Sequence, residues 1–198
     1  MTKTDMMRRE LIKRSIGAAK DRVALGMFNQ ALNAYCAVES MNMSKAEEFY
    51  GPLLKFLIDR EMIREFYMLS EYLKMDEATH CYYDMVLSLK LGDVVKLPSL
   101  VAKMVVVSKP SRLEMFIRRF CDSFEVPLTI DLVNFMLKCD LNVTSSVLDP
   151  ILKACDKCND RHYLVRCIFS IIKDHNLRAS TESFGIMIRL LVKLDDII

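Results

Sequence analysis

Residues 142–160, NVTSSVLDPILKACDKCND, and residues 178–196, RASTESFGIMIRLLVKLDD, repeat one helical pattern 36 residues apart. In this register the matching pairs are Leu148 with Phe184, Ile151 with Met187, Leu152 with Ile188, Lys153 with Arg189, and Asp160 with Asp196. A fixed period of about 30–40 residues is typical of stacked helical hairpins, each of which buries a face only against its neighbours. The pattern therefore predicts an all-α fold, a superhelical stack of antiparallel helical hairpins (an α-solenoid).

Helical periodicity extends along the rest of the chain. Of its 198 residues 52% are hydrophobic, which excludes disorder, and five Gly with five Pro are too few for an all-β protein. After a helix around residues 11–23, helices are expected at 22–40, 44–60, 62–74, 76–92, 100–107, 112–124, 127–138, 144–157, 160–174 and 180–194. Residues 1–198 are then a single repeat domain of five or six hairpins in a right-handed stack. Because Ile198 ends on a first helix without a capping repeat, a segment of a longer protein is expected.

Local signals mark several helix boundaries. Asp76 is a good N-cap, and Gly92 a natural C-terminal stop. Ser111 followed three residues later by Glu114 predicts a capping box. Gly51-Pro52 is expected to kink or split the helix of residues 44–60. The three consecutive valines at 105–107 also have strand propensity, so a strand is the alternative to a helix there.

The composition indicates the compartment. A formal net charge of +2 predicts neither a nucleic acid nor a membrane as partner from bulk electrostatics. The N-terminus lacks the apolar core of a signal peptide, and no apolar run approaches the ~18 residues that span a bilayer. Seven cysteines, an odd number set mostly among apolar neighbours, are typical of free thiols in a reducing compartment. We therefore expect a cytoplasmic protein with no membrane partner.

Residues 144–196 are similar to a pentatricopeptide-type repeat. Residues 159–173 resemble the second helix of such a repeat, and residues 174–178 its exit loop. Residues 49–62 and 81–94 fit the same pattern more weakly. Tetratricopeptide and other helical-hairpin arrays share this alternation. More faintly, the chain resembles the helical region of the testis- and ovary-specific PAZ-domain proteins, which implies a cytoplasmic germ-cell factor acting on transcripts.

The pentatricopeptide resemblance implies where RNA bases would be recognised: at a polar residue near the start of each first helix, two positions after an aromatic. In this chain those positions are Pro52, Tyr83, Pro150 and Ile186. Their side chains cannot distinguish bases by hydrogen bonding, although Tyr83 could stack on one. A protein partner on the concave face is therefore the leading hypothesis. An RNA-binding module acting in post-transcriptional regulation is the alternative.

Cys155-Asp-Lys-Cys158, with His162 and Cys167, is the grouping most like a zinc site. In the repeat register, however, Cys155 matches Leu191 and Cys158 matches Leu194, which favours buried thiols. No phosphate-binding glycine loop, GxSxG or HExxH motif occurs. The sequence therefore predicts a protein that is not an enzyme and has no metal, no cofactor and no small-molecule substrate.

Two basic clusters are candidate partner- or RNA-binding sites. The first lies in the N-terminal helix and contains Arg8, Arg9, Lys13 and Arg14. The second is a candidate phosphate-binding groove lined by Lys103, Lys109, Arg112, Arg118 and Arg119, and for both clusters a solvated face is the default interpretation. Tyr83 completes the predicted site residues.

Overall fold

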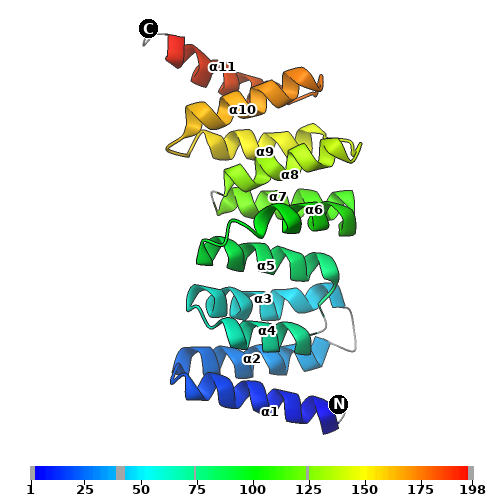
Figure 1. The fold of residues 1–198 in the computed structure, drawn as a ribbon, viewed down its shortest axis with the longest axis vertical. Coiled ribbons are helices and arrows are strands. Elements are labelled where there is room, and N and C mark those ends of the chain that lie inside the picture. Colours follow the sequence, from blue (N-terminus) through cyan, green and yellow to red (C-terminus); the bar gives the residue numbers. More distant parts are fainter. Residues whose placement is uncertain (1–2, 39–42, 74, 124, 196–198) are drawn as a thin grey trace. The chain divides into compact units, whose positions relative to one another are not determined.

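The computed structural model describes residues 3–38, 43–73, 75–123 and 125–195, and within these ranges the chain is all-α, with eleven helices and no strand (Figure 1). The helices are α1 (Lys3–Ala18), α2 (Arg22–Val38), α3 (Met43–Asp59), α4 (Ile63–Tyr72), α5 (Glu77–Leu91), α6 (Leu97–Val107), α7 (Pro110–Asp122), α8 (Val126–Lys138), α9 (Ser145–Cys155), α10 (Arg161–Asp174) and α11 (Thr181–Asp195). The predicted all-α class is confirmed, and each expected helix overlaps one of these eleven, although α1 begins and ends earlier than the expected 11–23. The superhelical stack of hairpins stays a prediction. The three valines at 105–107 are helical, within α6.

The chain divides into two compact units, Met1–Leu97 and Pro98–Ile198. Each has its own apolar core. The expectation of one repeat domain over residues 1–198 stays a prediction.

In the first unit the hairpins α1–α2 and α3–α4 face each other. Helix α1 packs against α2 and α4, and α3 packs against α2, α4 and α5. The four helices contribute Ile16, Phe28, Leu54 and Phe66 to the core, each at most 2% exposed. The second helix of one hairpin therefore meets the first helix of the next.

In the second unit the helices form two layers. The first helices α7, α9 and α11 pack in succession, α9 lying against both neighbours, and the second helices α8 and α10 pack against each other (Figure 1). Cross-layer contacts join α7 with α8, α8 with α9, α9 with α10, and α10 with α11. This alternation is the packing that the 36-residue period predicts for neighbouring hairpins.

The repeat register holds on one side of these helices. Ile151 and its match Met187 are both buried, at 0% and 1% exposed. Leu152 is also buried, but its match Ile188 is 61% exposed. The inward face of α11 therefore repeats that of α9, and the outward face does not.

The predicted boundaries of α5 are confirmed. The Asp76 carboxylate accepts a hydrogen bond from the Thr79 backbone N–H at 3.1 Å, and Gly92 ends the helix in the left-handed region with φ +68°. The prediction of a capping box at Ser111 is wrong. Helix α7 already begins at Pro110, whose fixed φ suits a first turn, so Ser111 lies inside it. Helix α3 is likewise not split at Gly51-Pro52, and Pro52 lies in its interior.

Candidate partner-binding site

A groove of about 510 Å³ lies between the first helices α7 and α9 of the second unit, and we call it the first-helix groove. It is lined by Arg118, Cys121 and Asp122 of α7, by Ser146, Asp149, Pro150, Lys153 and Ala154 of α9, and by Lys157 in the turn that follows. Its size is that of a pocket for one large side chain or a short peptide segment.

Hydrogen bonds between successive first helices hold the wall of this groove. Ser146 Oγ donates to Glu114 Oε1 at 2.8 Å, which links α9 to α7. Asp149 Oδ1 accepts from Ser183 Oγ at 2.7 Å and from the Ser180 backbone N–H at 3.2 Å, which links α9 to α11. Burial raises the pKa of Asp149, but the hydrogen bonds from Ser183 and Ser180, with the nearby Lys153 charge, outweigh it and leave the pKa below its ordinary value.

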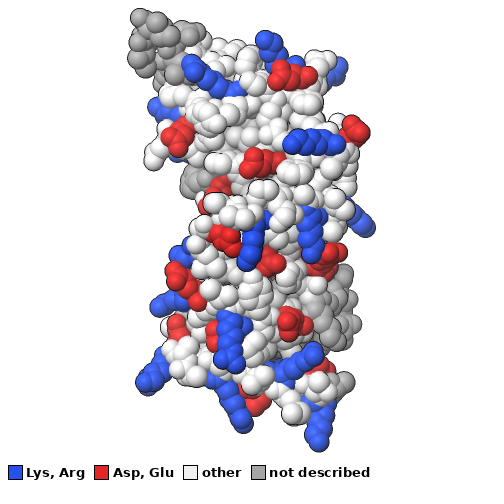
Figure 2. All heavy atoms as spheres, in the orientation of Figure 1, with Lys and Arg blue, Asp and Glu red and all other residues white. Residues whose placement is uncertain are grey.

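Basic side chains outnumber acidic ones along the groove. The lining contains three basic residues, Arg118, Lys153 and Lys157, and two acidic residues, Asp122 and Asp149. The Lys153 ammonium also pairs with Glu182 of α11 at 2.9 Å, and Arg189 pairs with Asp156 one turn further along. Over the face of the molecule shown in Figure 2, Lys and Arg interleave with Asp and Glu, and neither sign forms a continuous patch. With Lys153 paired to Glu182, Arg118 and Lys157 are the basic residues of the lining that form no ion pair among the described residues.

The second predicted basic cluster does not form one groove. Arg118 lines the first-helix groove, whereas Arg112 and Arg119 lie over the Phe116 ring at 5.7 and 5.8 Å from its centroid. Lys103 in α6 and Lys109 at the start of α7 are exposed and do not line this groove. Arg112 and Arg119 share a face because they are seven residues apart. Arg118 belongs to another side of the helix.

Tyr83 is unavailable to a partner in this structure, which corrects the prediction of a stacking residue. Its side chain is 2% exposed, and its hydroxyl donates a hydrogen bond to Glu47 Oε1 at 3.3 Å. The Tyr82 ring packs edge-on against the Tyr83 ring, with 5.0 Å between the two ring centroids. Sequence alone could not reveal this because Tyr83 is buried by α3, which lies some 30 residues earlier in the chain.

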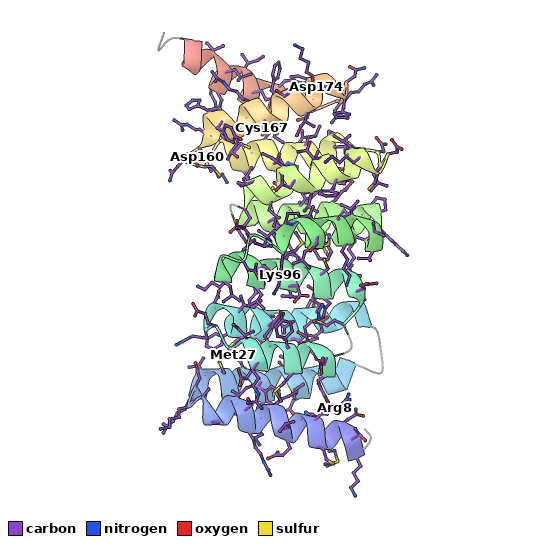
Figure 3. The ribbon with its side chains drawn as sticks, viewed as in Figure 1. Arg8, Met27, Lys96, Asp160, Cys167 and Asp174 are labelled. Carbon is purple, nitrogen blue, oxygen red and sulfur yellow. The ribbon has the colours of Figure 1, made fainter. Side chains whose placement is uncertain are left out.

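The predicted N-terminal cluster is exposed on α1. Arg8, Lys13 and Arg14 are exposed, and the Arg14 guanidinium pairs with Glu10 at 3.2 Å; Figure 3 labels Arg8. Arg9 and Lys13 line a small cleft of about 220 Å³ between α1 and α2, against Phe28 and Leu32.

Of the two cysteines near the end of α9, Cys155 belongs to the core, as the repeat register predicts, whereas Cys158, predicted in the same way, does not. Cys155 is fully buried, and burial raises its pKa to about 12. Cys158 is half-buried, and burial raises its pKa as well. Across the described ranges, no group of three or more His, Cys, Asp or Glu side chains is arranged to hold a metal ion.

Ser146, Asp149, Lys153 and Lys157 were not predicted as site residues. Each occupies an ordinary polar position of an amphipathic helix or the turn after it, so nothing local distinguishes them. The match of Lys153 with Arg189 in the repeat register was the available signal that a basic residue recurs at this position of successive first helices.

Comparison with known proteins gives one partial similarity. A pentatricopeptide repeat-containing mitochondrial protein of Arabidopsis thaliana is 31% identical over 84 residues, which cover 40% of this chain and 10% of that relative. No family model and no solved structure matches. The similarity supports a helical-repeat protein, and it gives no support to the resemblance to PAZ-domain proteins. Among the described helices, none is long and apolar enough to cross a membrane.

Proposed function

We propose that this chain is a non-catalytic helical-repeat scaffold that binds a protein partner through the face formed by its first helices. The observation that carries the proposal is the first-helix groove, which is lined by both polar and apolar side chains. Hydrogen bonds between α9 and its neighbours α7 and α11 hold its wall in place. A groove held in one conformation loses little entropy on binding, which favours a specific partner.

In this proposal the hairpins continue one another as an α-solenoid, and the partner lies along its concave side. The succession of α7, α9 and α11 in one layer supports this arrangement. The raised pKa values of the buried thiols support a role without catalysis, because a protonated thiol is a poor nucleophile. A cytoplasmic location is part of the same proposal.

The base-recognition positions favour a protein over an RNA ligand. Pro150 lines the first-helix groove and Ile186 is half-buried, and neither can hydrogen-bond to a base edge. Pro52 is exposed and equally unable to do so. An RNA partner would have to be bound through its phosphates alone.

RNA binding remains the second candidate function, in which the chain acts in post-transcriptional regulation. Two observations favour it: the similarity to a pentatricopeptide repeat-containing protein, and the basic side chains of Arg118, Lys153 and Lys157 in one groove. Phosphate contacts of this kind release counterions, so affinity would fall steeply as salt rises.

Site-specific photocrosslinking in cells separates the two functions. A benzoylphenylalanine replaces Lys157 at the first-helix groove, and in a matched control it replaces Lys173, an exposed lysine of α10. The proposal expects one defined protein adduct from position 157, identified by mass spectrometry and absent from position 173. The adduct should disappear when Arg118 is changed to Glu. An RNA adduct at position 157 would establish the alternative, and equal adducts at both positions would refute a specific site in this groove.

A further inference from the structure

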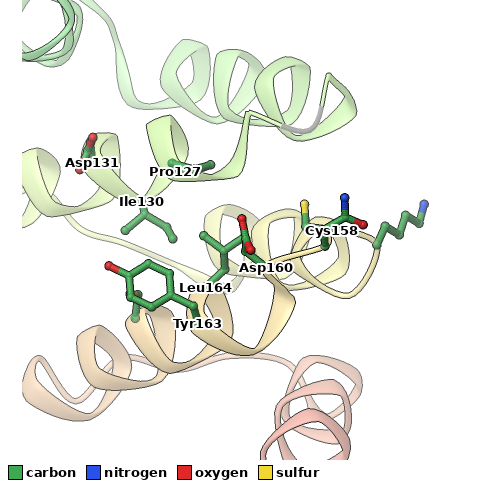
Figure 4. A pocket seen from close by; sticks show the side chains of 10 residues that line it. Pro127, Ile130, Asp131, Cys158, Asp160, Tyr163 and Leu164 are labelled. Carbon is green, nitrogen blue, oxygen red and sulfur yellow. The ribbon is translucent and has the colours of Figure 1, made fainter. Parts of the chain in front are cut away.

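A second groove, of about 570 Å³, lies on the other layer of the second unit, between the second helices α8 and α10. We call it the second-helix groove (Figure 4). It is lined by Pro127, Ile130 and Asp131 of α8, by Lys157, Cys158, Asn159 and Asp160 in the turn before α10, and by Tyr163, Leu164 and Cys167 of α10. Asp160 and Cys167 mark the start and the middle of α10 in Figure 3.

The middle of this groove is apolar. Ile130 and Leu164 face each other across it, and Pro127 lies beside them (Figure 4). Ile130 and Leu164 are 9% and 5% exposed, so their packed side chains form a firm apolar surface. Such a surface suits an aliphatic chain.

The charges at the edges of the groove are mainly acidic. The carboxylates of Asp131 and Asp160 line it, against the single cation Lys157. In the part of the chain that the structure describes, neither carboxylate forms an ion pair. Burial raises the pKa of Asp131, and the nearby Lys138 charge only partly offsets this, so the ionised carboxylate would gain from a close cation.

An aromatic ring completes the lining. Tyr163 is 69% exposed, and its side chain lines the groove together with that of Cys167. An exposed tyrosine ring beside carboxylates attracts a cation through its electron-rich face. The thiols of Cys158 and Cys167 add neutral, polarizable surface.

We propose that the second-helix groove binds a cationic side chain, an arginine or a lysine, presented by a basic segment of a protein partner. The methylene stem lies over Ile130 and Leu164 in the middle of the groove, beside the Tyr163 ring, and the charged head reaches one of its two acidic ends, at Asp131 or at Asp160 (Figure 4). Apart from Lys157, which lines both grooves, this site is made of residues from a different layer of helices than the first-helix groove, so its test is separate from that of the proposed function above. Charge complementarity is the argument for this occupant: an acidic side chain would meet two carboxylates, and an uncharged one would leave them unpaired.

The test is a titration of the isotope-labelled chain with Nα-acetylarginine methylamide, followed by the backbone amide NMR shifts. The matched probe is the citrulline analogue, which has nearly the same shape and no charge. We expect saturable shifts at Asp131, Asp160 and Tyr163 with the arginine probe, and at least tenfold weaker binding of the citrulline probe. Equal binding of the two probes, or shifts confined to other parts of the chain, would overturn the proposal.

Variants assign the effect to the groove. The double change Asp131→Asn with Asp160→Asn should weaken the arginine probe about tenfold, whereas the matched pair Asp140→Asn with Asp174→Asn, at exposed aspartates outside the groove, should not. Tyr163→Leu should weaken it and Tyr163→Phe should not, because phenylalanine keeps the ring face. All these side chains are exposed, so the variants should fold, and circular dichroism verifies it. An unchanged titration in the groove variants would show that the carboxylates do not bind the probe.

Discussion

Replacing Gly51 with alanine should destabilise the chain, although alanine is the better helix former. A Cβ atom at position 51 of α3 would lie 2.7 Å from the hydroxyl oxygen of Tyr83 on α5, closer than such atoms approach in proteins. The Tyr83 ring cannot move aside freely because it is 2% exposed and packs edge-on against Tyr82. Overpacking of a buried site costs about 1–3 kcal/mol, and alanine restores about 1 kcal/mol of helix propensity. The expected net loss is about 1 kcal/mol.

A double-mutant cycle isolates this contact. In the Tyr83→Phe background the hydroxyl is gone, and the remaining neighbours of the new Cβ are Glu47 Cγ at 3.8 Å and the ring carbon Cζ at 4.0 Å, which are ordinary contacts. Gly51→Ala should then stabilise the chain by about 1 kcal/mol, so the coupling between the two positions is about 2 kcal/mol. The free energy of unfolding is measured for all four proteins by urea titration with far-UV circular dichroism. If Gly51→Ala stabilises both backgrounds equally, the close approach of α3 to Tyr83 is wrong.

Two further predictions concern titratable groups of the second unit. Burial raises the pKa of Cys155 to about 12 and that of Cys121 to about 11. Both thiols should therefore react with iodoacetamide at pH 8 at least a hundredfold more slowly than the exposed Cys139, as measured by peptide mass spectrometry. Comparable reaction rates would contradict the burial of these two thiols. The folded-state pKa of Asp149 is lowered, so its carboxylate contributes stability above its ordinary pKa of about 4, and this contribution is lost as the pH falls through the folded value. Ser183→Ala should cost about 1 kcal/mol at pH 7 and less below pH 4 in urea unfolding, and a cost that does not change with pH would rule out this hydrogen bond as its source.

The helices themselves follow from local features of the sequence. Apolar residues at helical spacing, the Asp76 cap and the Gly92 stop involve residues within one or two turns of each other, so their effects are visible in the sequence. The burial of Cys155 could also be predicted from the sequence, because the 36-residue register matches it with an apolar position, Leu191.

Local patterns failed where a partner lies far along the chain. Glu114 was expected to cap its own helix with Ser111, but its carboxylate accepts a hydrogen bond from Ser146, 32 residues away. Tyr83 was expected on a binding surface, but α3 buries it. In both cases the contact partner lies more than 30 residues away in the chain, so a local pattern could not reveal it.

The all-α class and nearly all the helix positions were therefore contained in the sequence, because helix formation depends on neighbours three and four residues apart. The pairing of α1 with α4 and α2 with α3, and the gathering of Arg118, Lys153 and Lys157 around one groove, depended on how helices pack. Many helix faces have similar apolar patterns and can pair in more than one way, so local periodicity cannot select among them. Packing selects one pairing through the detailed fit of side chains, and that pairing places the polar residues that a partner can contact.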